Sequence, residues 1–84
     1  APVQVFTEVF TNAGVAPTPQ EVREPMGMLK WDHIRTMLEM PRIKREWIRL
    51  YGQAPTDTDA DKLYASYEPA LLHILTRYAD PNHM

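Results

Sequence analysis

The chain has 84 residues, of which 44% are apolar and 24% are charged, as expected for one small folded domain with a single modest core. The formal net charge of −2 argues against binding nucleic acid through bulk electrostatics, and the absence of cysteine excludes disulfides and thiolate metal sites. No apolar run approaches the roughly 20 residues that span a bilayer, and no signal peptide is visible, so we expect a cytoplasmic protein with no nucleic-acid or membrane partner.

Two helices are predicted in the first part of the chain. The first carries one apolar stripe with spacings of three and four residues, and Gly14 is expected to follow its last turn. The second starts at the segment TPQE, where Thr18 can be the N-cap, Pro19 the first helical residue and Glu21 the partner in a capping box. It must be short, because Pro25 disfavours helical geometry in the residue before it. The stripe of the first helix consists of Val5, Phe6, Val9, Phe10 and Ala13.

The third predicted helix runs from about Met28 to Glu39 and has Lys30 in its first turn. On a helical wheel, Lys30 lies at the edge of an apolar stripe that should face the core. On the same wheel, His33 and Met37 lie away from this stripe. The stripe itself consists of Trp31, Ile34 and Leu38.

Two further helical segments complete the chain. The fourth helix begins near Pro41 and ends at Tyr51, before Gly52. The last segment starts at Thr56, and Pro69 should kink or split it after Tyr67. Four or five helices with short connections predict an all-α fold, a small helical bundle. The buried face of the fourth helix should consist of Ile43, Trp47, Leu50 and Tyr51.

Two charged patterns resemble binding sites but are interpreted as ordinary helix surface. Four acidic residues match positions of a calcium-binding loop, yet Lys62 replaces the glycine that the loop needs, and Thr56 can instead cap a helix there. The basic segment PRIKREWIR, residues 41–49, is interrupted by Glu46 and lacks an aromatic platform, so we interpret it as a solvated helix face. The three histidines have no converging spacing, and no metal site is predicted in this chain. The acidic residues are Asp57, Asp59, Asp61 and Glu68.

Lys30 is the residue with the most chemical interest. A helix N-terminus carries partial positive charge, and apolar neighbours would add desolvation; both favour loss of the amine's proton and so make it a nucleophile. Candidates for such neighbours are Met26, Leu29, Ile34 and Met37. His33 lies one turn later and could pass protons. The plainer interpretation is that Lys30 simply extends into water, as most helix lysines do.

The segment REPMGMLKWDHIRTMLEMPRI, residues 23–43, resembles the phosphonoacetaldehyde hydrolase (phosphonatase) family of the haloacid dehalogenase superfamily. The resemblance covers nearly the whole chain, including APVQVFTEVFTNAGV at its start and YADP near its end. It implies that residues 1–81 form the helical cap domain of such an enzyme, without the Rossmann-like catalytic core. Residues 82–84 are interpreted as a remnant of cloning or as native sequence.

The resemblance also implies a chemistry. The family uses magnesium, bound by the core, to cleave the carbon–phosphorus bond of phosphonoacetaldehyde to acetaldehyde and phosphate. At the matching positions Lys30 forms an imine with the aldehyde, His33 transfers protons, Met26 lines the site and Gly27 belongs to the loop that closes over substrate. Family members also pair as homodimers through their caps.

A chain without the core is not expected to turn over substrate. Asp32 is expected to cap its helix or to pair with Arg35. The alternative to an enzyme segment is a non-enzymatic helical module, natural or engineered, that serves folding or dimerisation only.

Overall fold

The computed structural model describes residues 3–79, which form six α-helices and no strand. The predicted all-α fold is confirmed. There is one more helix than the four or five expected, because a break at Ser66 divides the last segment. The interpretation of residues 82–84 lies outside the described residues. The helices are α1 (Val3–Asn12), α2 (Pro19–Arg23), α3 (Lys30–Glu39), α4 (Pro41–Tyr51), α5 (Asp57–Ala65) and α6 (Tyr67–Ala79).

Local chemistry accounts for three of the helix ends. Thr18 caps α2 and shares a capping box with Glu21, as predicted. Thr56 caps α5, and its capping-box partner is Asp59. Gly52 ends α4 with a positive φ of 82°, a conformation that glycine adopts without steric penalty. These three helix ends confirm the predictions made from the sequence.

The start of α3 differs from the prediction. The helix begins at Lys30 rather than near Met28, and Leu29 occupies the N-cap position without a side-chain hydrogen bond. Residues 24–29 form a turn instead, in which the Met26 amide donates to the Arg23 carbonyl at 2.9 Å. Lys30 is therefore the first helical residue and follows directly on this turn.

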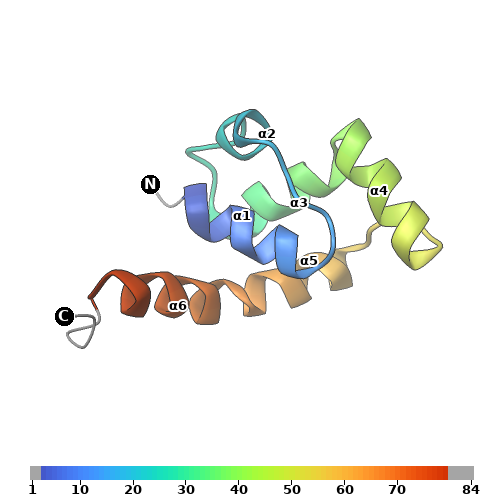
Figure 1. The fold of residues 1–84 in the computed structure, drawn as a ribbon. Coiled ribbons are helices and arrows are strands. Elements are labelled where there is room, and N and C mark those ends of the chain that lie inside the picture. The colour runs from blue at the N-terminus through green and yellow to red at the C-terminus, as the bar shows by residue number, and fades with distance from the viewer. Residues whose placement is uncertain (1–2, 80–84) are drawn as a thin grey trace.

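The helices pack in two groups around one core. Helix α1 packs against α2 and α6, while α3 packs against α4 and α5. Helices α5 and α6 follow one another in nearly the same direction and run along one side of the molecule (Figure 1). The break at Ser66 lies one residue before the predicted split, and Pro69 falls within the first turn of α6, where its missing N–H is not needed.

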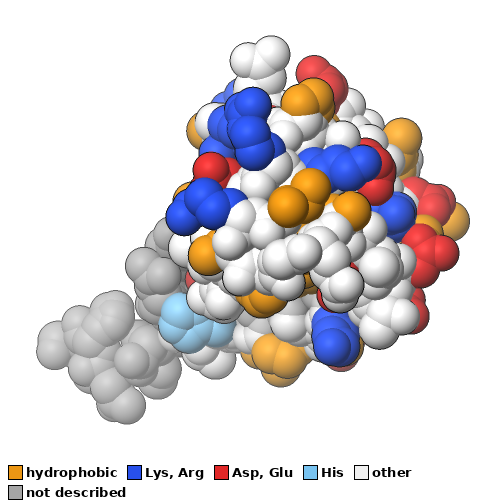
Figure 2. All heavy atoms as spheres, turned by 90° about the vertical axis from the view of Figure 1, so that its right-hand side faces the viewer, with side chains coloured by type: hydrophobic (Ala, Val, Ile, Leu, Met, Phe, Trp, Pro, Cys, Tyr) orange, Lys and Arg blue, Asp and Glu red, His pale blue; other side chains and the backbone are white. Residues whose placement is uncertain are grey.

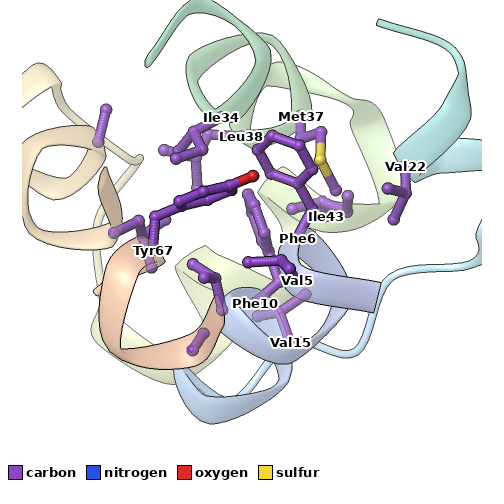
Figure 3. Packing of buried hydrophobic residues seen from close by; sticks show 14 of the residues in the cluster. Val5, Phe6, Phe10, Val15, Val22, Ile34, Met37, Leu38, Ile43 and Tyr67 are labelled. Carbon is purple, nitrogen blue, oxygen red and sulfur yellow. The ribbon is translucent and has the colours of Figure 1, made fainter. Parts of the chain in front are cut away.

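The core is made of apolar side chains from all six helices (Figure 3). The predicted stripe of α1 is confirmed, since its Val and Phe residues are buried. On α3, His33 and Met37 are buried as well, although they lie away from the predicted stripe. Helix α3 packs against α4 and α5, and its His33 stacks on Phe6 of α1, so its buried sector is wider than a single stripe. The core consists of Val5, Phe6, Val9, Phe10, Val15, Val22, Ile34, Met37, Leu38, Ile43, Trp47, Ala60, Leu63, Tyr67 and Ala70.

The buried face of α4 is shorter than predicted. Ile43 and Trp47 are buried, but Leu50 and Tyr51 are exposed, contrary to the prediction. The last turn of α4 reaches only the loop after α1, where the Tyr51 hydroxyl donates a hydrogen bond to the Ala13 carbonyl. The ring of Tyr51 also tilts against Trp47, at 4.5 Å between centroids.

Three basic residues of α4, namely Arg42, Lys44 and Arg49, are paired with carboxylates. Arg42 donates two hydrogen bonds to Glu21, at 2.6 and 3.0 Å, which joins α4 to α2. Lys44 pairs with Glu39 at 3.0 Å. On the side of the molecule shown in Figure 2, basic side chains are separated by acidic and apolar ones rather than forming one continuous positive surface. Among the described helices, none is both long and apolar enough to cross a membrane.

Candidate functional site

Lys30 lies at the surface, at the junction of three helices. Its Nζ is 5.2 Å from the centroid of the Tyr67 ring, in the geometry of a cation over an aromatic face. Tyr67 is the first residue of α6, so the start of α3 meets the break between α5 and α6. A pocket of about 420 Å³ opens there, lined by Lys30, Tyr64, Ala65, Tyr67, Glu68 and Leu71.

The surroundings of Lys30 differ from those expected. The four predicted apolar neighbours do not enclose it: Leu29 is 77% exposed, Met26 is exposed too, and Ile34 and Met37 point into the core. Lys30 is itself exposed, which agrees with the plainer interpretation that its side chain extends into water and not with the alternative of an amine buried among these neighbours. The wall beside the amine instead comes from α5 and α6, and nothing in the local sequence of α3 indicates this contact.

Two polar contacts attach the first half of α3 to α5. The indole Nε1 of Trp31 donates to Asp61 at 2.7 Å, and Arg35 donates to Asp57 at 2.8 Å. Arg35 also pairs with Glu39 at 2.7 Å, so the expected pairing with Asp32 was wrong, and no side chain caps α3. Trp31, the residue after Lys30, is thereby held in place by a hydrogen bond between α3 and α5.

These contacts use two of the carboxylates of the apparent calcium loop. Asp59 is occupied as well, in the capping box of α5. Among residues 3–79, no three His, Asp or Glu side chains are placed so that they could hold a metal ion. The residues of this segment therefore do not fit a magnesium site.

His33 is 1% exposed and stacks on Phe6, with 3.9 Å between ring centroids and 9° between ring planes. Its Nε2 is buried without a hydrogen-bond partner. Burial lowers the pKa of His33, and a hydrogen bond with the Val22 backbone raises it by less, so the ring favours the neutral form. Phe6 also contacts Tyr67, at 5.2 Å between centroids, and thus lies between His33 and the tyrosine beneath Lys30.

Met26 and Gly27 lie in the turn before α3. Gly27 has a φ of 106°, and a Cβ at this position would meet no atom within 4 Å. Met26 is exposed and does not line the pocket beside Lys30. The structure thus brings Lys30 and His33 onto neighbouring turns of α3, whereas Met26 and Gly27 remain in the exposed turn that leads into it. Tyr67 is the site residue that sequence reasoning missed.

No family model matches the chain. The chain is, however, similar to curated proteins. It is 52% identical over 83 residues to a phosphonoacetaldehyde hydrolase of Bacillus thuringiensis (strain Al Hakam) and to one of Bacillus anthracis, and each match covers 99% of this chain. A phosphonoacetaldehyde hydrolase of Bacillus cytotoxicus is 52% identical over 81 residues. The chain spans only 31% of the length of each of these relatives. The resemblance seen in the sequence is confirmed, and along nearly its whole length this chain is a homologue of one segment of the phosphonoacetaldehyde hydrolases.

Proposed function

We propose that this chain is the helical cap segment of a phosphonoacetaldehyde hydrolase and that Lys30 supplies the amine that forms an imine with the substrate. The observation that carries the proposal is the 52% identity, over 99% of the chain, to proteins named for hydrolysis of phosphonoacetaldehyde. The position of Lys30 supports it, because the amine is exposed beside an open pocket where an aldehyde can reach it.

The proposed chemistry begins with condensation. The unprotonated Lys30 amine attacks the aldehyde carbon, a carbon–nitrogen bond forms, and the carbonyl oxygen leaves as water; overall, ammonium plus aldehyde give protonated imine plus water. The imine then accepts the electron pair of the carbon–phosphorus bond, so that the carbon leaves as an enamine while phosphorus passes to an oxygen nucleophile. Protonation of the enamine carbon and hydrolysis release acetaldehyde, and one further water releases phosphate.

We propose that His33 serves the proton transfers around Lys30. It lies one turn further along α3, and its buried Nε2 has no hydrogen-bond partner among residues 3–79. A neutral imidazole with a free nitrogen is the form that can accept a proton. Met26 and Gly27 are proposed to act at the substrate side of the same site, the first as an apolar wall and the second as the flexible point of the turn that covers it. Both residues are exposed in the turn that leads directly into Lys30, where a substrate can reach them, and this supports these roles.

The nucleophile that receives phosphorus, and the magnesium ion that supplies charge stabilisation when bound, are proposed to belong to the part of the relatives that this chain does not span. The absence of a fitting donor set among residues 3–79 is in keeping with that assignment. We therefore expect no turnover by this chain alone.

The test is reductive trapping. The chain is incubated with phosphonoacetaldehyde and borohydride, and the adduct is mapped by intact mass and peptide analysis. An adduct concentrated on Lys30, with Lys44 and Lys62 left unmodified, supports the proposal. An adduct spread evenly over these three amines contradicts a special role for Lys30. Lys30→Arg, which keeps the charge, should remove the specific adduct and leave the helical circular dichroism unchanged.

One observation favours a second candidate, a helical module that acts by association. Leu72 on α6 is 61% exposed and Leu75 on the same helix is exposed as well, which leaves apolar surface uncovered in the monomer. A homodimer through this cap would cover such a surface. Light scattering over a concentration series distinguishes the outcomes: a stable dimer supports association, and a monomer at all concentrations argues against it.

A further inference from the structure

We infer that Tyr67 is a positioning residue for Lys30: its ring face holds the amine at the mouth of the pocket and stabilises the positive charge of the imine that forms there. This inference rests on the proposed function of Lys30. The carrying observation is the contact itself, with Nζ at 5.2 Å from the ring centroid. Ammonium and protonated imine are both cations, and the negative face of an aromatic ring attracts either.

Tyr67 is suited to this task because its ring is fixed. The residue is 5% exposed, and its ring packs against Phe6, which in turn stacks on His33. The Tyr67 ring that Lys30 contacts is thus the first of three rings packed one on the next, Tyr67, Phe6 and His33, which extend into the core. A ring held in this way directs a flexible lysine side chain to one place without itself moving.

The start of α3 is fixed relative to the ring by an independent contact. The bond between Trp31 and Asp61 joins the residue after Lys30 to α5, only a few residues before Tyr67. The backbone of Lys30 and the ring that its amine contacts are therefore both tied to the α5–α6 junction. The aldehyde carbon that condenses with the amine would enter the pocket beside the ring, where Tyr64, Glu68 and Leu71 leave about 420 Å³.

A series of rings that differ in electron density but hardly in shape tests the inference. Phenylalanine and 3,4,5-trifluorophenylalanine are placed at position 67 of this chain, and imine formation with phosphonoacetaldehyde is measured by borohydride trapping at several pH values. Tyr67→Phe should leave the Lys30 adduct almost unchanged. The fluorinated ring no longer attracts cations, so it no longer holds the Lys30 side chain at the mouth of the pocket, and the Lys30 adduct should fall about fivefold. Lys44, which contacts Glu39 rather than a ring, is the internal reference in each sample.

Two controls separate the ring from its surroundings. Glu68→Gln tests whether the carboxylate of the pocket, and not the ring, holds the cation. Trifluorophenylalanine at position 51, an exposed aromatic on α4, tests for a general effect of fluorination. Circular dichroism and thermal unfolding verify the fold of every variant.

The outcomes distinguish the two proposals. Equal Lys30 adducts with phenylalanine and its fluorinated form overturn the role of Tyr67 and leave the proposed function intact. A loss with Tyr67→Phe as large as with the fluorinated ring assigns the effect to the hydroxyl and also overturns the inference. A wild-type chain without any Lys30-specific adduct contradicts the proposed function, and the inference then falls with it.

Discussion

The indole N–H of Trp31 donates a hydrogen bond to Asp61 over 2.7 Å, and this bond joins the first turn of α3 to the middle of α5. This hydrogen bond is significant because α3 has no side-chain cap and begins at Lys30, the residue proposed to form the imine. The bond gives this helix start a fixed position that its own sequence does not supply.

The contribution of this bond is measurable with a double-mutant cycle. We expect Trp31→Phe and Asp61→Ala together to show a coupling of about 1 kcal/mol, since the acceptor is charged but exposed to water. The cycle subtracts the loss of packing that Trp31→Phe causes whether or not Asp61 is present, so that only the energy of the hydrogen bond remains. Urea unfolding of the four proteins, followed by circular dichroism, gives the coupling. Strictly additive losses would mean that the bond contributes nothing.

His33 should make the stability of the chain depend on pH. Burial lowers the pKa of the folded histidine below the unfolded value of 6.5, so the unfolded chain binds a proton first. Stability is therefore complete above pH 6.5 and falls as the pH drops toward the folded pKa, by at most about 1.4 kcal/mol per pH unit. His33→Phe keeps a ring against Phe6 and removes the titration. Parallel stability curves of the two proteins between pH 7.5 and 5 would contradict this prediction.

Gly27 is expected to be required for its backbone conformation alone. Its φ is 106°, and no atom would lie within 4 Å of an added Cβ, so Gly27→Ala should cost about 1–2 kcal/mol through φ and not through a clash. The matched control is D-alanine at the same position in a chemically synthesised chain, which adds the same methyl group but favours positive φ. Thermal unfolding should show a loss with L-alanine only; equal losses with both would indicate crowding instead.

The ion pair between α2 and α4 should stabilise the fold above acidic pH. The hydrogen bonds from Arg42 lower the pKa of Glu21, so this stabilisation is present above the unfolded value of 4.5 and disappears as the pH falls through the folded value. Because Arg42 is partly exposed, we expect Glu21→Gln to cost only about 1 kcal/mol at pH 7. Unfolding at a series of pH values provides the measurement.

Glu46→Gln is the control for this pair, since Glu46 pairs with Arg49 at the surface and should contribute nothing measurable. A difference between wild type and Glu21→Gln that stays constant down to low pH would contradict the assignment to the charged pair.

The parts of the fold that follow from neighbouring residues were predictable. Thr18 and Thr56 begin helices because a hydroxyl can satisfy the free amides of the first turn, and Gly52 ends one because it adopts a positive φ. The burial of His33 and Met37 was not predictable in this way. A helical wheel assumes one covering partner, whereas α3 packs against α4 and α5 and also contacts α1 through the stack of His33 on Phe6.

The candidate site was predictable only in part. Lys30 and His33 share a motif and one helix, so the resemblance identifies both. The contact between Lys30 and Tyr67 joins two helices that are distant in the sequence, and a tyrosine within an apolar stripe has no local pattern that distinguishes a platform from a core residue. For the same reason the exposure of Leu50 was missed, because no local signal shows where the supporting helix ends.

The contacts of Phe6 have a consequence for how the chain acquires its structure during synthesis. This residue of the first helix packs against His33 and against Tyr67 of the last helix. While a ribosome is making this segment, α1 emerges before α3 and α6, which supply the rings that pack on Phe6. The core closes only after α6 has left the exit tunnel, and until then part of the apolar stripe of α1 is open to chaperones.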